Sequence, residues 1–284
     1  MTDFFHDLFQ YTFLQNAFLA AILASIPCGI IGSFIVVRRS TYIAGAISHS
    51  LLGGMGIAYY LHIAHDLKAI TPLHGAIAAA VGAAIIIGTV SSSGKHRTDT
   101  VLSAVWSIGM ALGIVFIMAT PGYGQDLMSY LFGNILMVSR NDLLLMVILN
   151  GIIVINIVLF YPKLLAVSFH RELAELRGIR VRIYEMLFLI LSALTIVLLV
   201  HVVGIVMSIA LLTLPAASAG YLFNRLSLMM IAATVFCMLF TAGGLILSYA
   251  PEWPTGPTII IVCGVFYLAA ITLSKLMLKF FKRA

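Results

Sequence analysis

The chain has 284 residues, of which 62% are hydrophobic and only 9% are charged, and it carries a net charge of +6. Soluble globular domains carry charge on about a quarter of their residues, so this composition excludes a soluble fold. Apolar runs of about 20 residues recur along the chain, and the alternating pattern of barrel strands is absent. The sequence therefore predicts an all-α, polytopic helical membrane protein.

The first ten residues, MTDFFHDLFQ, lack a cationic start and a small-residue cleavage site. They predict a short amphipathic helix at the outer interface rather than a signal peptide. Nine apolar runs follow, and we expect eight or nine membrane crossings, since Gly204 is either in a loop or at a break inside one long segment. The runs are 14–37, 43–61, 72–91, 101–119, 142–161, 185–201, 204–223, 227–248 and 258–279.

Residues 128–138, MSYLFGNILMV, are apolar but too short to span. We expect an interfacial or re-entrant helix here, on the outer side, after the turn at 121–124. Short cytoplasmic loops are rich in Lys and Arg. With the N-terminus outside, all of the sixteen lysines and arginines except Lys68 and Arg140 lie at the inner face. This orientation places the C-terminus in the cytoplasm and attributes the basic charge to that face, not to nucleic-acid binding.

The longest polar connection, residues 161–185, is predicted to be cytoplasmic. Residues 168–177 favour a short charged helix that ends at Gly178, a residue type typical of the position just after a helix. Such a helix on the inner face suits the docking of a soluble partner. A basic loop that only fixes the topology is the alternative.

His49 is the strongest candidate for a working residue, because it stands alone inside the apolar run 43–61, in AGAISHSLLGG. An ionisable side chain at bilayer depth is costly, and usually faces a protein interior or a water-filled path. A histidine that only hydrogen-bonds between helices is the alternative. Three further histidines cluster near the predicted outer loop, where they either meet metal or are solvated: His62, His65 and His74. His201 lies near the outer end of its apolar run and is a further candidate.

Several other residues have a structural explanation as their first interpretation. Three cysteines lie singly in apolar runs without metal-type spacing, and we expect them to be small packing residues. Pro215, followed by small residues, predicts a kinked helix and a candidate gate. The cysteines are Cys28, Cys237 and Cys263. Gly109 and Gly113 predict a helix-packing face. Asp99 and Asp126 predict helix caps.

Five strings occur in a fixed order and together resemble one family, the membrane permeases of ABC importers for manganese, zinc and iron(II), over residues 12–278. No single string is specific, but their order and spacing are. They are the Arg pair with ISHSLLGG (38–54), DLMSYLFGNIL (126–136), the loop with Leu176, Gly178 and Ile179, VGIVMSIALLTLPAASAG (203–220) and PTGPTIII (254–261).

The resemblance implies a single transmembrane permease domain over residues 1–284, in the cell membrane, with no permanently bound cofactor. It implies two permease copies over two ATPase subunits, and an extracytoplasmic protein that delivers the metal. The chain has no G-x-x-x-x-G-K-[ST] phosphate loop, so we expect it not to be an enzyme and ATP to be hydrolysed by a separate chain. The coupling helix that seats in the ATPase is expected at His170, Glu172, Ala174, Leu176 and Gly178.

His49 matches the histidine that the family places in its metal path, and neutral imidazole suits zinc, manganese and iron(II). The sequence departs from the family at Gly45, where many members have an Asp one helical turn earlier. Because manganese favours carboxylate ligands, this loss weakens a manganese site more than a zinc site. A permease for larger metal chelates stays open as an alternative. A stand-alone ion-coupled carrier is the other, although the predicted helix interiors lack carboxylates and no repeat is visible.

Overall fold

The computed structural model describes residues 2–67, 69–93, 98–122 and 131–281, and in these residues the regular structure is helical, with no strand. The prediction of an all-α polytopic protein is confirmed. Eight helices in this part of the chain are long and apolar enough to cross a membrane. They are α2 (Thr12–Val37), α4 (Pro72–Ser93), α5 (Thr98–Ala119), α7 (Arg140–Phe169), α9 (Val181–Val203), α10 (Ile205–Leu222), α11 (Leu226–Tyr249) and α12 (Thr255–Phe281).

The run 43–61 forms a helix as predicted, α3 (Thr41–Ala64), but α3 is not among these eight. Helix α3 is 24 residues long, which is enough to cross a membrane, so its less apolar composition, not its length, excludes it from these eight. Serines, tyrosines and closely spaced glycines take the place of large apolar side chains. Much of α3 is buried against α4 and α5, and a helix between two neighbours needs small residues more than a lipid-facing surface.

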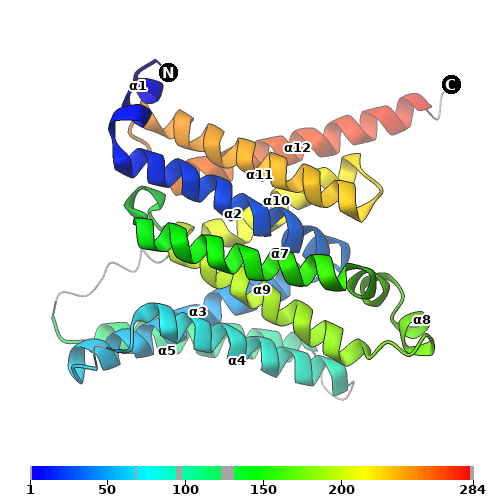
Figure 1. The fold of residues 1–284 in the computed structure, drawn as a ribbon, viewed down its shortest axis with the longest axis horizontal. Helices are drawn as coiled ribbons and strands as arrows, with labels where there is room; N and C mark the ends of the chain where they lie inside the picture. Colours follow the sequence, from blue (N-terminus) through cyan, green and yellow to red (C-terminus); the bar gives the residue numbers. More distant parts are fainter. Residues whose placement is uncertain (1, 68, 94–97, 123–130, 282–284) are drawn as a thin grey trace. The chain divides into compact units, whose positions relative to one another are not determined.

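The chain divides into two compact units. The first unit comprises Met1–Arg39, Phe132–Gly151 and Val202–Ala284. In it α2 packs against α10 and α11, and α12 packs against the same two helices (Figure 1). Gly29 and Gly32 of α2 lie against the backbone of Thr234 and Leu212, so small residues allow the close approach that membrane helices use. Cys28, Cys237 and Cys263 are buried free thiols here.

The second unit comprises Ser40–Leu131 and Ile152–His201. Its centre is the bundle of α3, α4 and α5, in which α3 packs along both neighbours while α4 and α5 have few mutual contacts (Figure 1). Gly54 of α3 and Gly75 of α4 face each other closely: a Cβ on either would lie 2.1 Å from the other's carbonyl oxygen. Helix α7 contributes residues to both units.

Nine of the first ten residues form helix α1 (Thr2–Gln10), and the prediction of a short helix here is confirmed. Two contacts hold it to the C-terminal end of α11. The Tyr249 hydroxyl donates a hydrogen bond of 2.5 Å to Asp7 Oδ2, and the ring of Phe4 meets the ring of Tyr249 edge-on at 5.2 Å between centroids. Helix α1 is thereby part of the first unit's packed structure.

The expected outer helix at 128–138 lies only partly within the described residues. Residues 131–132 are helical, and a 3-10 turn, η1 (Ile135–Met137), follows; Asp126 lies outside the described residues. Gly133, at φ 62°, packs on the chain between α9 and α10: a Cβ there would stand 2.4 Å from the Gly204 nitrogen. The described part of this segment is thus in backbone contact with the chain at Gly204.

Gly204 is the one residue between α9 and α10, and its φ of 80° ends the first helix. Gly204 therefore interrupts the helix, and no loop longer than this residue separates α9 from α10. Pro215 lies inside α10, and the helix continues through it.

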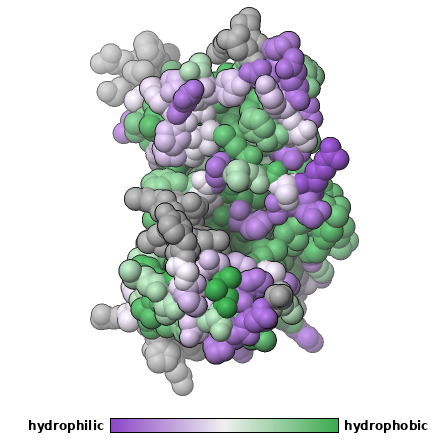
Figure 2. All heavy atoms as spheres, turned by 90° about the vertical axis from the view of Figure 1, so that its left-hand side faces the viewer, coloured by the Kyte–Doolittle hydropathy of each residue, from purple (hydrophilic) through white to green (hydrophobic). Residues whose placement is uncertain are grey.

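The surface of the protein is mixed in character. In the view of Figure 2, which faces the side where α1 lies, hydrophilic residues gather in patches between hydrophobic surfaces.

Candidate functional site

His49 lies in the middle of α3 and is partly buried. Its Nδ1 atom is buried and has no hydrogen-bond partner among the described residues. The neighbouring Ser48 hydroxyl is in the same condition. Buried polar atoms are almost always paired in folded proteins, so the unpaired imidazole nitrogen can accept a partner that the described residues do not supply. No described residue pairs with this nitrogen in the way that a histidine hydrogen-bonded between helices requires.

The indole ring of Trp106, on α5, covers the imidazole of His49. The two ring centroids lie 4.3 Å apart and the planes meet at 11°, a stacked arrangement. The same indole also covers Gly45, one helical turn before His49: a Cβ built on Gly45 would lie 3.3 Å from Cζ3 of Trp106. The aromatic ring therefore occupies the space beside His49 that a side chain at position 45 would enter.

Backbone packing between α3 and α5 fixes this arrangement. A Cβ on Gly53 would lie 2.6 Å from the Gly109 carbonyl oxygen, and one on Gly56 would lie 2.6 Å from that of Gly113. Gly109 and Gly113 thus form the helix-packing face that the sequence predicts. Trp106 lies one turn before Gly109 on the same face of α5. The close contact of the glycines therefore places the Trp106 ring beside His49.

The other histidines do not join His49. The Nδ1–H of His62 donates to the Ile70 carbonyl at 3.1 Å, while His74 Nδ1 accepts from the Thr71 amide at 3.3 Å. His65 meets the ring of Tyr60 edge-on. Within the described ranges, no group of three His, Cys, Asp or Glu side chains could hold a metal. His62 and His74 thus hydrogen-bond within the connection between α3 and α4. His201 is exposed at the end of α9, and Asp99 lies in the first turn of α5.

An apolar groove of about 880 Å³ opens where α4 and α5 diverge on either side of α3. Among its lining residues only Ser50 and His74 have polar side chains, and neither His49 nor Trp106 lines it. A groove with so few donor atoms does not suit a hydrated or partly dehydrated cation. It is therefore separate from the candidate site around His49.

The connection between α7 and α9 contains the predicted short helix, α8 (Arg171–Leu176). Its boundaries differ from the expected 168–177, because α7 continues through Pro162 to Phe169. The amide of Ile179 donates to the Ala174 carbonyl at 3.0 Å and that of Gly178 to Glu175 at 2.9 Å, with Gly178 at φ 76°. This is the Schellman ending that glycine permits, so the predicted stop at Gly178 is confirmed.

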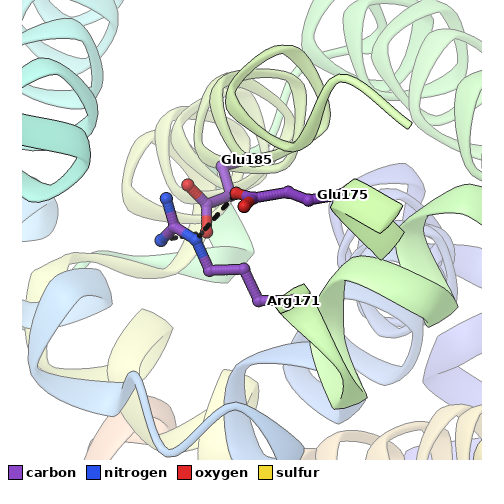
Figure 3. Close-up of polar contacts among 3 residues, drawn as sticks. All are labelled: Arg171, Glu175 and Glu185. Atoms are coloured by element: carbon purple, nitrogen blue, oxygen red, sulfur yellow. Dashed lines mark hydrogen bonds and ion pairs between the residues drawn. The ribbon is translucent and has the colours of Figure 1, made fainter. Parts of the chain in front are cut away.

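Two contacts hold α8 to its surroundings. Arg171 Nη1 donates to Glu185 Oε1 of α9 at 3.0 Å, and Arg171 Nε lies 3.6 Å from Glu175 Oε1 (Figure 3). Ala174 lies three residues further along, on the same face of the helix, where it is only 1% exposed and packs with Val167 and Val181. Helix α8 is thus held along one face, while Leu176 in its last turn is exposed.

The expected docking residues divide into two groups. His170, Glu172, Leu176 and Gly178 are exposed, and Leu176 has 85% of its surface open, which is unusual for a leucine. The prediction that Ala174 is a docking residue is wrong. Ala174 is buried against Val167 and Val181, where it holds α8 in place and is not open to a partner. A small residue there lets α8 approach the ends of α7 and α9.

Comparison with known proteins identifies the family. Residues 10–274 match the family described as the ABC 3 transport family. The chain belongs to this family. It is 38% identical to the "Probable metal transport system membrane protein" of Chlamydia muridarum, over 97% of this chain and 93% of the relative. It is 35% identical to the "Manganese transport system membrane protein MntC" of Halalkalibacterium halodurans, over 96% and 91% of the two chains.

A solved structure agrees with the same placement. The structure titled "PsaBC from Streptococcus pneumoniae in complex with Fab" superposes with a TM-score of 0.83 and 30% sequence identity, covering 95% of this chain and 94% of that chain. Membership of an ABC 3 transport family disfavours the stand-alone carrier. It also fits the absence of a phosphate-binding loop, since ABC transporters place ATP hydrolysis in a distinct domain or chain.

Sequence reasoning on this ABC 3 family chain missed two features of the site. Trp106 was not singled out, and neither was the pair of Arg171 and Glu185. A tryptophan inside an apolar run is ordinary, and only its spacing of three residues before Gly109 was available as a signal. Arg171 and Glu185 are fourteen residues apart, so no helical periodicity relates them.

Proposed function

We propose that the chain is the membrane permease subunit of an ABC importer that moves divalent transition-metal ions into the cytoplasm, with His49 as a ligand on the path. Family membership supports the transport role. The observation that carries the assignment of the site is the buried Nδ1 of His49, which has no hydrogen-bond partner in the described part of the chain. A neutral imidazole nitrogen is a good ligand for first-row divalent metals.

One imidazole is too little for a metal site, and the described residues hold no cluster that completes it. A second copy of the chain would bring a second His49 to a two-fold axis, since symmetric dimers present the same patch twice. We therefore propose a homodimer with the pair of histidines facing a shared path. A site of two imidazoles and water molecules binds weakly enough to release its ion, which transport requires.

The metal is zinc or manganese, with iron(II) as a third candidate. A relative named for manganese transport supports manganese. The absence of a carboxylate at Gly45 supports zinc, because zinc accepts imidazole readily while manganese prefers carboxylate oxygen. Metal chelates stay the second candidate substrate. Free ions suit the partly buried single histidine better, because a chelate supplies its own ligands and leaves the imidazole nitrogen without a role.

The ATP-binding subunit is proposed to dock on α8. An apolar side chain as exposed as Leu176, beside Glu172 and Gly178 on a short rigid helix, suits insertion into a groove of a partner. Ala174 and Arg171 support the same helix from the other side. Motion of the ATPase would pass through α8 to the ends of α7 and α9.

We further propose that the chain is one permease domain in the cell membrane, with its N-terminus outside and its C-terminus in the cytoplasm. The distribution of lysine and arginine supports this orientation. An extracytoplasmic metal-binding protein would deliver the ion at the outer side, where Gly133 packs on Gly204.

The test is ATP-driven uptake by the permease reconstituted with its ATPase, measured for zinc, manganese and iron(II) separately. We expect His49→Ala to abolish uptake while the complex stays assembled, and His65→Ala, a matched control near the outer end of the same helix, to retain it. Wild-type uptake by His49→Ala would remove His49 from the path. Uptake that persists with a hydrolysis-deficient ATPase would favour the carrier, and uptake of chelated metal alone would favour the second candidate.

A further inference from the structure

We propose that Trp106 is a positioning and specificity-determining residue, which orients the His49 imidazole and, together with Gly45, sets which metal the permease prefers. This inference rests on the proposed metal role of His49. It starts from three facts about one indole ring: it stacks on His49, it covers Gly45, and it is held by a helix whose position is fixed at Gly109.

Stacking controls the plane of the imidazole without blocking its nitrogens. The lone pair of an imidazole nitrogen lies in the ring plane, so a ligand approaches from the edge. Trp106 covers a face, with the planes only 11° apart, so the indole does not lie in the ring plane from which a ligand approaches. Contacts behind a metal ligand commonly hold it in orientation, and their loss lowers metal affinity or activity about 10- to 100-fold. No described residue holds the His49 ring through a hydrogen bond to Nδ1, so the stacked indole is the contact that fixes the ring plane.

The same ring excludes a second protein ligand. A side chain at position 45 lies one turn before His49 on the same helix face. Its first carbon would already be 3.3 Å from Cζ3 of the indole, tighter than ordinary van der Waals contact, so the ring would have to move by a few tenths of an ångström. Glycine at position 45 and tryptophan at position 106 are therefore matched, and a larger side chain that would bring an oxygen ligand to His49 competes with the indole for the same space.

The ring cannot yield by a shift of its helix. A Cβ on Gly109 would stand 2.5 Å from the Ser50 Cα, and Gly53 is equally close to the Gly109 carbonyl. The backbones of α3 and α5 are in contact one turn beyond the stack. With 36% of its surface open, the indole has free space on the side away from His49, but its Cα is held. The metal therefore meets a nitrogen ligand beside an aromatic wall, an environment that favours zinc over manganese.

Five variants test the proposal in the reconstituted complex, with uptake of zinc and of manganese measured separately and in competition. Trp106→Leu removes the aromatic face, and we expect uptake to fall on the order of tenfold, whereas Trp106→Phe keeps a face and stays near wild type. Gly45→Asp alone loses uptake, while Gly45→Ala, the control for a single carbon, loses far less. The double variant Gly45→Asp with Trp106→Leu regains uptake and shifts the preference toward manganese relative to wild type.

A spectroscopic readout separates positioning from folding. The chain has two tryptophans, so Trp253→Phe leaves Trp106 as the only indole of the purified full-length permease. Addition of zinc or manganese is expected to change its emission, and His49→Ala to abolish the change. Trp106→Leu with wild-type uptake and wild-type metal preference would overturn the inference, as would a double variant no better than Gly45→Asp. If His49→Ala itself transports normally, the proposed site fails, which is a different result.

Discussion

Arg171 at the start of α8 donates a hydrogen bond of 3.0 Å to Glu185, near the start of α9. Glu185 is only 16% exposed, while Arg171 is 47% exposed. The pair connects the exposed short helix to a long membrane helix. It is the polar counterpart of the apolar contact that Ala174, three residues further along α8, makes with Val167 and Val181.

Glu185→Gln is expected to loosen the connection between ATP hydrolysis and uptake. An amide keeps the shape of the side chain but loses the charge that strengthens the bond from Arg171. Because the pair is partly solvated, its loss costs less than about 1 kcal/mol of stability. The measurement is metal transported per ATP hydrolysed, which should fall several-fold. Glu175→Gln is the control, since Glu175 lies 3.6 Å from Arg171 and is 56% exposed; equal ratios in both variants would refute the prediction.

Leu176→Ser is expected to weaken assembly with the ATPase by at least tenfold in dissociation constant. Truncating a central apolar contact of an interface typically costs about 2 kcal/mol, which corresponds to more than tenfold. The leucine is 85% exposed in the free chain, so its removal leaves the fold unchanged. Binding of the purified ATPase to permease in detergent measures the effect. Leu67→Ser, at another exposed leucine outside the helices, should bind as wild type, and unaltered binding by Leu176→Ser would contradict docking at this residue.

Gly109→Ala is expected to destabilise the bundle of α3, α4 and α5. The added methyl would lie 2.5 Å from the Ser50 Cα and force the two helices apart, and overpacking of this kind costs about 1–3 kcal/mol. A thermal stability assay in detergent should show a lower Tm. Gly82→Ala on α4 is the matched control, because no described atom lies within 4 Å of a Cβ there. An unchanged Tm for Gly109→Ala would mean that the helices are not in backbone contact.

Tyr249→Phe is expected to loosen α1 without affecting the rest of the chain. The substitution removes the hydroxyl that donates to Asp7 at 2.5 Å but retains the ring that meets Phe4. The cost is about 1.5–3 kcal/mol for a hydrogen bond to a carboxylate. Hydrogen exchange in residues 2–10 should accelerate, whereas Tyr42→Phe, at a half-exposed tyrosine of α3, should leave it unchanged. Equal protection in both variants would show that the hydroxyl does not hold the helix.

The helices themselves could be predicted from the sequence, because each is an apolar run long enough to span. Every predicted run from 14–37 to 258–279 became a helix, with boundaries moved by a few residues. The largest shift is at α7, which passes through Pro162; in a membrane protein neighbouring groups can satisfy the carbonyl that proline leaves free. The stop at Gly178 was predictable because it depends on one local backbone conformation.

The surroundings of the site could not be predicted, because they depend on which helices touch and at what register. The stack of Trp106 on His49 needs α5 to pack on α3 at Gly109 and Gly53, a relation that hydropathy does not contain. Ala174 shows the same limit on a smaller scale. Its string resembles a docking loop, yet the side chain faces inward. Periodicity locates helices, while burial of a single small residue is decided by its neighbours in space.

Gly204 alone separates α9, with 23 residues, from α10, with 18. As one straight rod these residues would measure about 60 Å, roughly twice the thickness of the apolar core of a bilayer. The chain therefore leaves one crossing and begins the next with no surface loop between them. Epitope tags, protease sites and bulky labels, which topology mapping normally places in such loops, have no position to occupy here, and Gly133 already fills the space beside the joint.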